Sequence, residues 1–126
     1  MYSGYRIKIN GIIVSNDFIS QGSYSSKRVR RVLEEYYDAN GVLHEELSAR
    51  ETMEISFAIR ERNMHEQAYL NPLFQKHENI SVEYWDDISA EYKTSTFKME
   101  NPVFAHRNTR NGAISYAKTS IVLKEY

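Results

Sequence analysis

The chain has 126 residues and a net charge of −1, with 16 Lys and Arg residues against 17 Asp and Glu residues. The absence of cysteine excludes disulfides and thiolate metal sites, and the balanced charge does not favour a general nucleic-acid binder, which is more often basic overall. No segment resembles a signal peptide or approaches the roughly 18 apolar residues of a transmembrane helix, so we expect one soluble domain, residues 1–126, without a membrane partner.

A tight hairpin is predicted near the amino terminus. Residues Tyr5–Ile9 alternate apolar and charged side chains at period two, and Ile12–Val14 resume the apolar run after Asn10-Gly11. Asn-Gly between two such runs is a strong hairpin signal, because both residues tolerate positive φ. The polar residues 15–26 that follow predict a loop, with a short strand around Phe18 and Ile19.

Residues 27–37 fit two structures. Their apolar residues recur at helical spacing, and Ser26 could cap such a helix, whereas their period-two alternation is poor. The turn sequence Asp38-Ala39-Asn40-Gly41, in which Asn40 and Gly41 adopt positive φ at little cost, favours a strand. With tyrosines before it and Val42-Leu43 after it, this turn predicts the tip of a second hairpin with long, charged and partly exposed strands.

The middle of the chain predicts a core strand and then the only helix. Residues 51–60 alternate strictly, with Met53, Ile55, Phe57 and Ile59 on one face. Residues 62–76 predict a helix capped by Asn63, with Glu66 completing a capping box and Pro72 bending or restarting it. The apolar residues at helical or near-helical spacing are Met64, Ala68, Tyr69, Leu73 and Phe74.

The remaining residues alternate strands and turns. We expect strands at residues 80–85 and 92–99, an extension of the second through residues 103–106, a turn at 108–112 and one long final strand at 113–126. About seven or eight strands with one helix predict a mainly β (α+β) fold, an antiparallel sandwich or barrel with a flanking helix.

No catalytic or metal-binding pattern is present. The histidines at positions 44, 65, 77 and 106 lack the spacing of metal ligands, and no Gly-x-Ser-x-Gly or phosphate-binding loop occurs. Adjacent carboxylates such as Glu34-Glu35 point to opposite faces of a strand, which does not suit general acid–base catalysis. The prediction is therefore a protein that is not an enzyme, with no catalytic residues, no metal and no cofactor.

The basic run at residues 27–31 is the only concentrated charge in the sequence. With nearby tyrosines it could bind nucleic acid or a protein partner, as a small binding module would. Glu34, Glu35, Glu45 and Glu46 follow, and a hairpin would bring them close to the arginines. A salt-bridge surface, across strands or between subunits, is the more economical interpretation.

The whole pattern resembles small tail proteins of siphophages and prophages in Firmicutes. The resemblance rests on the two hairpins, the strand at residues 53–59, the helix, the segment Glu78–Asp87, Thr96–Glu100 and Phe104–Arg107. It implies the tail-tube-like fold, a β-sandwich or half-barrel with a flanking helix, in which a long protruding hairpin reaches adjacent copies. It leaves tail tube and tail-tip or baseplate ring as alternatives.

The resemblance implies a structural role in the virion tail, after synthesis in the host bacterial cytoplasm. The partners would be copies of the chain in a ring and neighbouring tube, tape-measure or baseplate proteins, with nucleic acid only passing through a lumen. Residues 27–49 would then form the assembly arm. The predicted subunit-interface residues are Lys27, Arg28, Arg30, Arg31, Tyr36, Tyr37, Asp38, Asn40, Gly41, Leu43 and Glu45.

Overall fold

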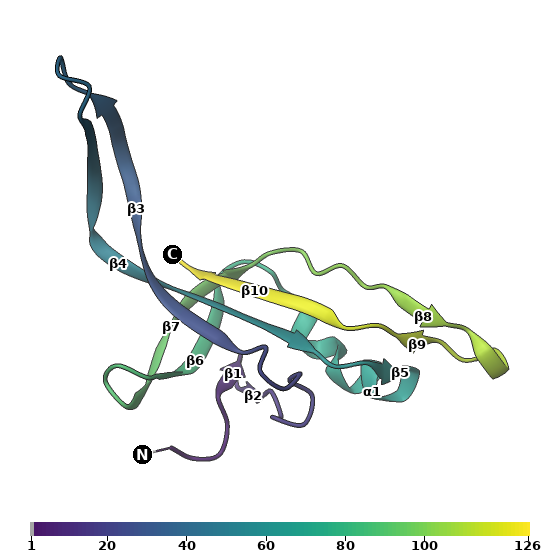
Figure 1. Cartoon of the computed structure of the whole chain (residues 1–126). Helices are drawn as coiled ribbons and strands as arrows, with labels where there is room; N and C mark the ends of the chain where they lie inside the picture. Colours follow the sequence, from purple (N-terminus) through teal and green to yellow (C-terminus); the bar gives the residue numbers. More distant parts are fainter. Residues whose placement is uncertain (1) are drawn as a thin grey trace.

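The computed structural model describes residues 2–126, apart from the side chains of residues 30–36 and 44–50. Its larger sheet has seven antiparallel strands in the order β2-β1-β6-β7-β10-β4-β3. These strands are β1 (Ile7–Ile9), β2 (Ile12–Ile13), β3 (Ser25–Tyr37), β4 (Leu43–Ile59), β6 (Ile80–Asp86), β7 (Glu91–Met99) and β10 (Thr119–Glu125). The smaller sheet joins β5 (Arg62–Asn63), β9 (Ser115–Tyr116) and β8 (His106–Asn108). The predicted fold class, mainly β with antiparallel strands in an open half-barrel, one flanking helix and a protruding hairpin, is confirmed (Figure 1).

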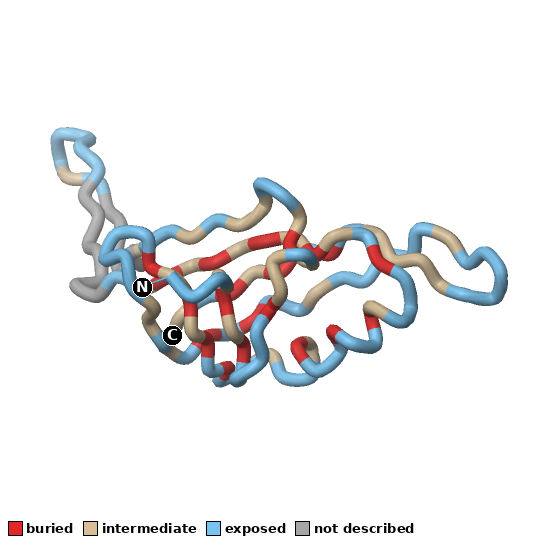
Figure 2. The backbone as a smooth tube through the Cα atoms, turned by 90° about the horizontal axis from the view of Figure 1, so that it is seen from below, coloured by how far each residue is buried: buried red, intermediate tan, exposed pale blue. Residues whose placement is uncertain are grey.

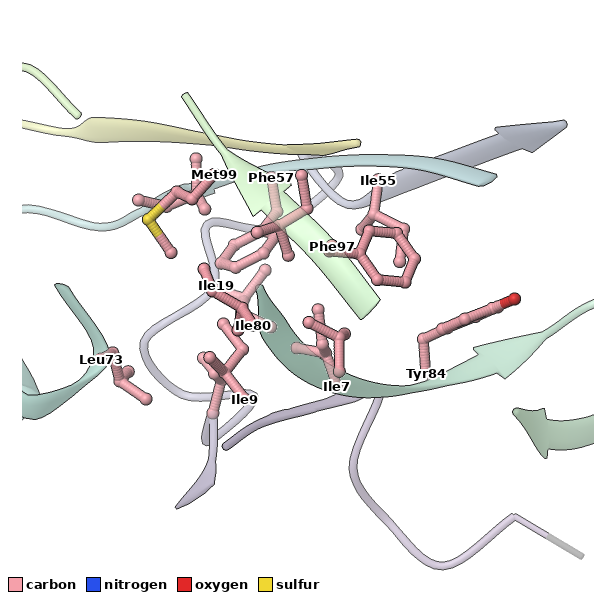
Figure 3. Packing of buried hydrophobic residues seen from close by; sticks show 14 of the residues in the cluster. Ile7, Ile9, Ile19, Ile55, Phe57, Leu73, Ile80, Tyr84, Phe97 and Met99 are labelled. Atoms are coloured by element: carbon pink, nitrogen blue, oxygen red, sulfur yellow. The ribbon is translucent and has the colours of Figure 1, made fainter. Parts of the chain in front are cut away.

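The core lies on the inner face of the curled seven-stranded sheet. β4 buries Met53, Ile55, Phe57 and Ile59, as its strict alternation predicted. In Figure 3, Ile55 and Phe57 face Ile7, Ile9 and Ile80 from the opposite part of the sheet, and all of these side chains belong to one buried cluster. Removal of such side chains from water, at about 1.5–3 kcal/mol each, is what favours the curled arrangement.

The amino-terminal hairpin is confirmed, and its turn is the predicted one. Asn10 and Gly11 have φ angles of 49° and 82°, the left-handed pair that a two-residue turn between twisted strands requires. Asn10 also joins the hairpin to β6, because its backbone N–H donates to the carbonyl of Ser81 at 2.7 Å. Ile19, in the following loop, makes the expected short strand contact, a single bridge to Ile59.

Helix α1 (Met64–Leu70) begins at the predicted capping box, and its apolar face differs from the prediction. The Asn63 side chain accepts the Glu66 N–H at 2.9 Å, and Pro72 opens a 3₁₀ turn, η1 (Asn71–Phe74). The helix buries Gln67 and Leu70 and leaves Met64 and Tyr69 exposed. Sequence spacing did not indicate this face, because a polar residue, Gln67, turns inward to bind Arg62.

The expected final strand, residues 113–126, is divided between the two sheets. β9 pairs with β5 and β8, whereas β10 lies between β4 and β7 in the larger sheet. β8 begins at His106 and is not a continuation of β7, so the expected extension through residues 103–106 is wrong. The buried Arg62 lies at this division, because its guanidinium donates to the Ala117 carbonyl and the Thr119 hydroxyl where the chain changes sheets.

Two extensions leave the body at opposite ends (Figure 1). One is the hairpin arm, defined here as residues 29–52 of β3 and β4, where β4 pairs with β3 and no longer with β10. The other is the basic arm, defined as residues 101–118, which contains β8, the predicted turn at η2 (Arg110–Gly112) and β9. Both ends are exposed in Figure 2.

Candidate assembly interface

The tip of the hairpin arm is an ordered turn. Asp38 accepts the Asn40 and Val42 N–H groups on its side-chain Oδ1 at 2.9 and 3.0 Å, and its carbonyl accepts the Gly41 N–H at 3.0 Å. Gly41 has φ of 77°, which explains the glycine, whereas Asn40 does not take the positive φ that the sequence allowed. The turn therefore holds the tip in one shape.

Apolar side chains are exposed beside this turn. Tyr37, Val42 and Leu43 have exposed fractions of 69%, 54% and 42%, although Leu and Val are residues that usually lie in the core. The tip of the hairpin arm lies far from the body of the molecule (Figure 1), so no described side chain of the body covers it. Such a tip suits contact with another molecule.

The middle of the hairpin arm concentrates like charges. In the register of β3 and β4, Glu34 lies opposite Glu46 and Glu35 lies opposite Glu45. In this register Arg30 lies opposite Glu51, and the expected proximity of the glutamate and arginine side chains falls outside the described residues and stays a prediction.

The root of the hairpin arm is fixed by a buried carboxylate. Asp86, at the end of β6, is 2% exposed, and its Oδ2 accepts hydrogen bonds from Arg28 at 2.8 Å, Lys93 at 3.0 Å and Ser89 at 2.9 Å. Burial alone would raise the pKa of Asp86, but the bonds from Lys93, Ser89, Arg28 and the Ile88 N–H outweigh it and hold that pKa well below its ordinary value. Arg28 lies on β3, so this ion pair ties the edge strand that carries the arm to β6.

The predicted interface residues fall into two separate groups. Tyr37, Asp38, Asn40, Gly41 and Leu43 meet at the tip. Lys27 and Arg28 lie at the root, opposite Glu54 and Met53 of β4. The side chains of Arg30, Arg31, Tyr36 and Glu45 lie outside the described residues. A role in subunit contacts stays a prediction for all eleven.

The sequence patterns described above did not predict the basic arm. Residues 101–118 contain Arg107, Arg110, Lys118 and His106 and no Asp or Glu. Arg107 pairs with Glu61 at 2.9 Å, whereas Arg110 and Lys118 are exposed and have no carboxylate partner among the described side chains. The absence of acidic residues over 18 positions was the signal that could have found it, because an extension formed by these residues carries charges of one sign only.

A groove of about 360 Å³ runs beside this arm. It lies between residues 100–105 and β10 and is lined by Val103, Lys118, Ser120 and Val122, among others. Its lining combines the apolar side chains of Val103 and Val122 with a cation, Lys118, and an anion, Glu100.

Other kinds of site were also sought in the part of the chain that the structure describes. There, no three His, Asp or Glu side chains gather as metal ligands would. None of the described helices is long and apolar enough to cross a membrane.

The fold is shared with chains of solved phage-like particles. One similar chain comes from the virion of the native gene transfer agent (GTA) particle, with a TM-score of 0.55, 12% identity and coverage of 98% of this chain and 91% of the other. Another comes from the tail of the empty GTA particle, computed with helical refinement and C6 symmetry, with a TM-score of 0.51, 14% identity and the same coverages. At these identities the similarity shows a common fold.

Over residues 1–126 the sequence matches the model of a family of unknown function (DUF6711), and the chain belongs to that family. No curated protein matches the chain.

Proposed function

We propose that this chain is a structural, non-enzymatic subunit of a phage or prophage tail. The observation that carries the proposal is a fold shared over 98% of the chain with chains of the GTA virion and of the GTA tail. The exposed apolar tip of the hairpin arm supports it, because a projecting, ordered tip is suited to contacts between subunits. The chain would act in the virion tail and be made in the cytoplasm of the host.

A ring of identical copies is the assembly we propose. β2 and β3 are the two edges of an open sheet, and edges that meet those of neighbouring copies are protected from uncontrolled pairing. Contacts between different surfaces of identical copies close into a ring when the rotation permits. The C6 symmetry of the GTA tail makes six copies the ring size to test first.

The partners would be copies of the chain and neighbouring tube, tape-measure or baseplate proteins. Nucleic acid would pass through the lumen without specific binding, and no cofactor is needed. The alternative, a module that binds nucleic acid through residues 27–31, is less well supported, because Arg28 is held by Asp86 and Lys27 lies opposite Glu54.

Immunogold electron microscopy of particles purified from cells that encode the chain tests this proposal. An antibody against the chain is expected to label tails: gold along the whole length indicates a tube subunit, and gold at one end indicates a tail-tip or baseplate ring. Particles from cells in which the gene is deleted provide the control. If the chain is abundant in the lysate and absent from purified particles, the proposal is wrong.

A further inference from the structure

The chain contains three Asn-Gly pairs, and each lies in a turn. Asn10-Gly11 joins β1 to β2, Asn40-Gly41 lies at the tip of the hairpin arm, and Asn111-Gly112 lies in η2, the turn between β8 and β9 at the far end of the basic arm (Figure 1). Asparagine before glycine is the residue that a chain most readily modifies by itself, because the glycine nitrogen has no neighbouring Cβ to hinder its approach to the side-chain amide. The three pairs are identical in sequence, so differences between them depend on their surroundings.

We propose that Asn111 is a self-modification site, at which the folded chain converts a neutral side-chain amide into a carboxylate with water as the only reactant. Asn10 and Asn40 keep their amides for much longer. The inference goes beyond the proposed function and does not rest on it, because it concerns the chemistry of one turn. Its result is the first carboxylate in residues 101–118, which contain no Asp or Glu.

The reaction proceeds through a cyclic imide. The backbone nitrogen of Gly112 loses its proton and attacks Cγ of Asn111, and the side-chain nitrogen leaves with a proton as ammonia. Water then adds to one of the two carbonyl carbons of the ring and breaks its bond to the Gly112 nitrogen, which regains a proton. Opening at Cγ gives aspartate, and opening at the main-chain carbonyl gives isoaspartate. Either product carries one new negative charge.

The amide of Asn10 is held away from this reaction. Its Oδ1 accepts the Ser81 N–H at 3.0 Å, and the backbone N–H of Asn10 donates to the Ser81 carbonyl at 2.7 Å. Rotation of the side chain toward Gly11 would break the first of these bonds, and release of the turn would disturb the pairing of β1 with β6 beside the buried Ile9. Local opening at this turn is therefore costly.

The amide of Asn40 lies in a negative environment. The N–H of Gly41, the group that would have to attack, donates to the Asp38 carbonyl at 3.0 Å, and the Asp38 carboxylate accepts the Asn40 N–H at 2.9 Å. Residues 32–47 around this turn include five acidic residues and no Lys or Arg. The attack requires a negatively charged nitrogen, so nearby carboxylates disfavour it.

The surroundings of Asn111 offer much less resistance. Residues 109–113 are all exposed, and the Asn111 side chain makes no hydrogen bond to any described residue. The Ala113 N–H donates to the Arg110 carbonyl at 3.1 Å, and the Arg110 N–H reaches Asn108 Oδ1 only at 3.4 Å. An exposed turn with so few contacts opens at low cost, and such opening lets the amide reach the glycine nitrogen.

The charge of Arg110 also favours the reaction. Arg110 lies two residues before Gly112, is exposed and has no carboxylate partner among the described side chains. Its positive charge stabilises the negatively charged nitrogen that attacks Asn111, and no acidic residue of the basic arm opposes this effect. Easy opening and positive charge therefore act on the same turn.

Peptide mapping of the aged protein tests the site. The folded full chain is incubated at neutral pH in water enriched in the heavy oxygen isotope, so that only carboxylates formed during the incubation carry the label. Trypsin in ordinary water then releases the three pairs in separate peptides, residues 9–27, 32–50 and 111–118, and mass spectrometry measures the converted fraction of each pair. We expect conversion of the pair in the third peptide to be at least about tenfold faster than in the other two.

Two substitutions test the electrostatic cause. The variant R110Q removes the positive charge, and we expect it to slow conversion at Asn111 about threefold. The matched control K27Q removes the same charge from an exposed position at the root of the hairpin arm and should leave that rate unchanged. The variant D38N removes a negative charge from the tip and should quicken conversion at Asn40.

The outcomes that contradict the inference are distinct. Equal rates in the three pairs, or a faster rate at Asn10 or Asn40 than at Asn111, would overturn the site. An unchanged rate in R110Q, with the variant shown by its thermal melt to be folded, would overturn the role of Arg110. The variant N111D provides the reference product, and the aged chain is expected to co-elute with it in anion-exchange chromatography.

Discussion

Asp86 is the residue that ties the hairpin arm to the rest of the sheet. It is one of the few buried charged residues among the described side chains, and both of its cationic partners come from other strands. A carboxylate in this environment is stabilising only while it is ionised and paired. The pH dependence of stability should therefore reveal it.

Replacement of Asp86 with Asn (D86N) is expected to lower the free energy of unfolding by about 1–2 kcal/mol at pH 7, less than for a fully buried pair because Arg28 and Lys93 are partly exposed. The folded-state pKa of Asp86 lies below its ordinary value, so its contribution is complete above about pH 4 and is lost as the pH falls further. Urea unfolding at pH 7 and at pH 3 measures both effects. The exposed neighbour Asp87 provides the control, D87N; equal losses in the two variants would contradict the assignment.

Tyr24 presents the opposite case, a polar group without a partner. Its ring stacks on Phe57 with the centroids 5.9 Å apart, and its buried hydroxyl makes no hydrogen bond to any described residue. Burial raises the pKa of this hydroxyl above its ordinary value, which reflects a site unsuited to charge. Removal of the oxygen should therefore cost nothing.

The variant Y24F is expected to be as stable as the unmodified chain or more stable by up to about 1 kcal/mol. Tyr92 gives the contrast, because its hydroxyl donates to the Tyr5 carbonyl at 2.8 Å and accepts the Ser3 N–H at 2.9 Å. We expect Y92F to lose about 1 kcal/mol. Thermal melts of the two variants compare them, and a less stable Y24F would indicate that the Tyr24 hydroxyl has a partner after all.

At the scale of elements, Arg62 joins the two sheets and the helix. It is 3% exposed, and its guanidinium donates to Gln67, to the carbonyls of Arg60 and Ala117 and to the Thr119 hydroxyl. Its carbon Cζ lies 5.4 Å from the centre of the Tyr116 ring. The acceptors lie in α1, in β10 and in the connections after β4 and β9, so the position of β8 and β9 depends on one side chain.

Replacement of Arg62 with Lys keeps the charge and loses the forked geometry. We expect R62K to be destabilised by about 2–4 kcal/mol, since a lysine cannot reach all of these acceptors and leaves some of them buried without partners. Amide hydrogen exchange should quicken most in β8 and β9. The control is R107K, at the exposed ion pair with Glu61, which is expected to change stability by less than about 0.5 kcal/mol. Similar unfolding of both variants would contradict a joining role for Arg62.

Local sequence patterns predicted where turns, strands and the helix lie better than they predicted which strands pair with one another. The turn at Asn10-Gly11, the alternation of β4 and the capping box at Asn63 each depend on a few neighbouring residues, so the sequence predicted them. The division of residues 113–126 depends on Arg62, some fifty residues earlier in the chain, and no local period reports such a contact. Period two shows which residues share a face and does not show which strand lies beside them.

The candidate interface shows the same limit. The tip was predictable because its turn chemistry is local to Asp38–Gly41. The basic run at residues 27–31 drew attention because its charges are contiguous, although one of them, Arg28, is engaged within the chain. Arg110 and Lys118 were overlooked because eight positions separate them in the sequence, and they lie in η2 and at the junction of β9 and β10.

At the scale of the whole molecule, the body and the hairpin arm are separable. The core residues of β4 end at Met53, and β10 pairs with β4 only from Glu54 onward, so the arm adds no described side chain to the core. Stability should therefore reside in the body and association in the arms.

Excision of the arm tests this division. Arg30 lies opposite Glu51, so a two-residue Asn-Gly turn can replace residues 31–50 and close the shortened hairpin. We expect the shortened chain to unfold within about 1 kcal/mol of the full chain and to remain monomeric at concentrations where the full chain associates. Urea unfolding and light scattering measure the two properties. A shortened chain that fails to fold, or that still forms rings, would contradict the division.

The open edge of β3 also affects how newly made chains behave before any ring has formed. A strand of 13 residues with one unpaired side is a template on which newly made chains could stack into fibres. β3 carries charges of one sign near its start, at Lys27 and Arg28, and of the other sign at Glu34 and Glu35. Two such strands that pair in parallel and in register would place each charge beside a charge of the same sign. These charged residues of β3 therefore act as gatekeeper residues. They disfavour in-register stacking of chains that are present at high concentration before assembly.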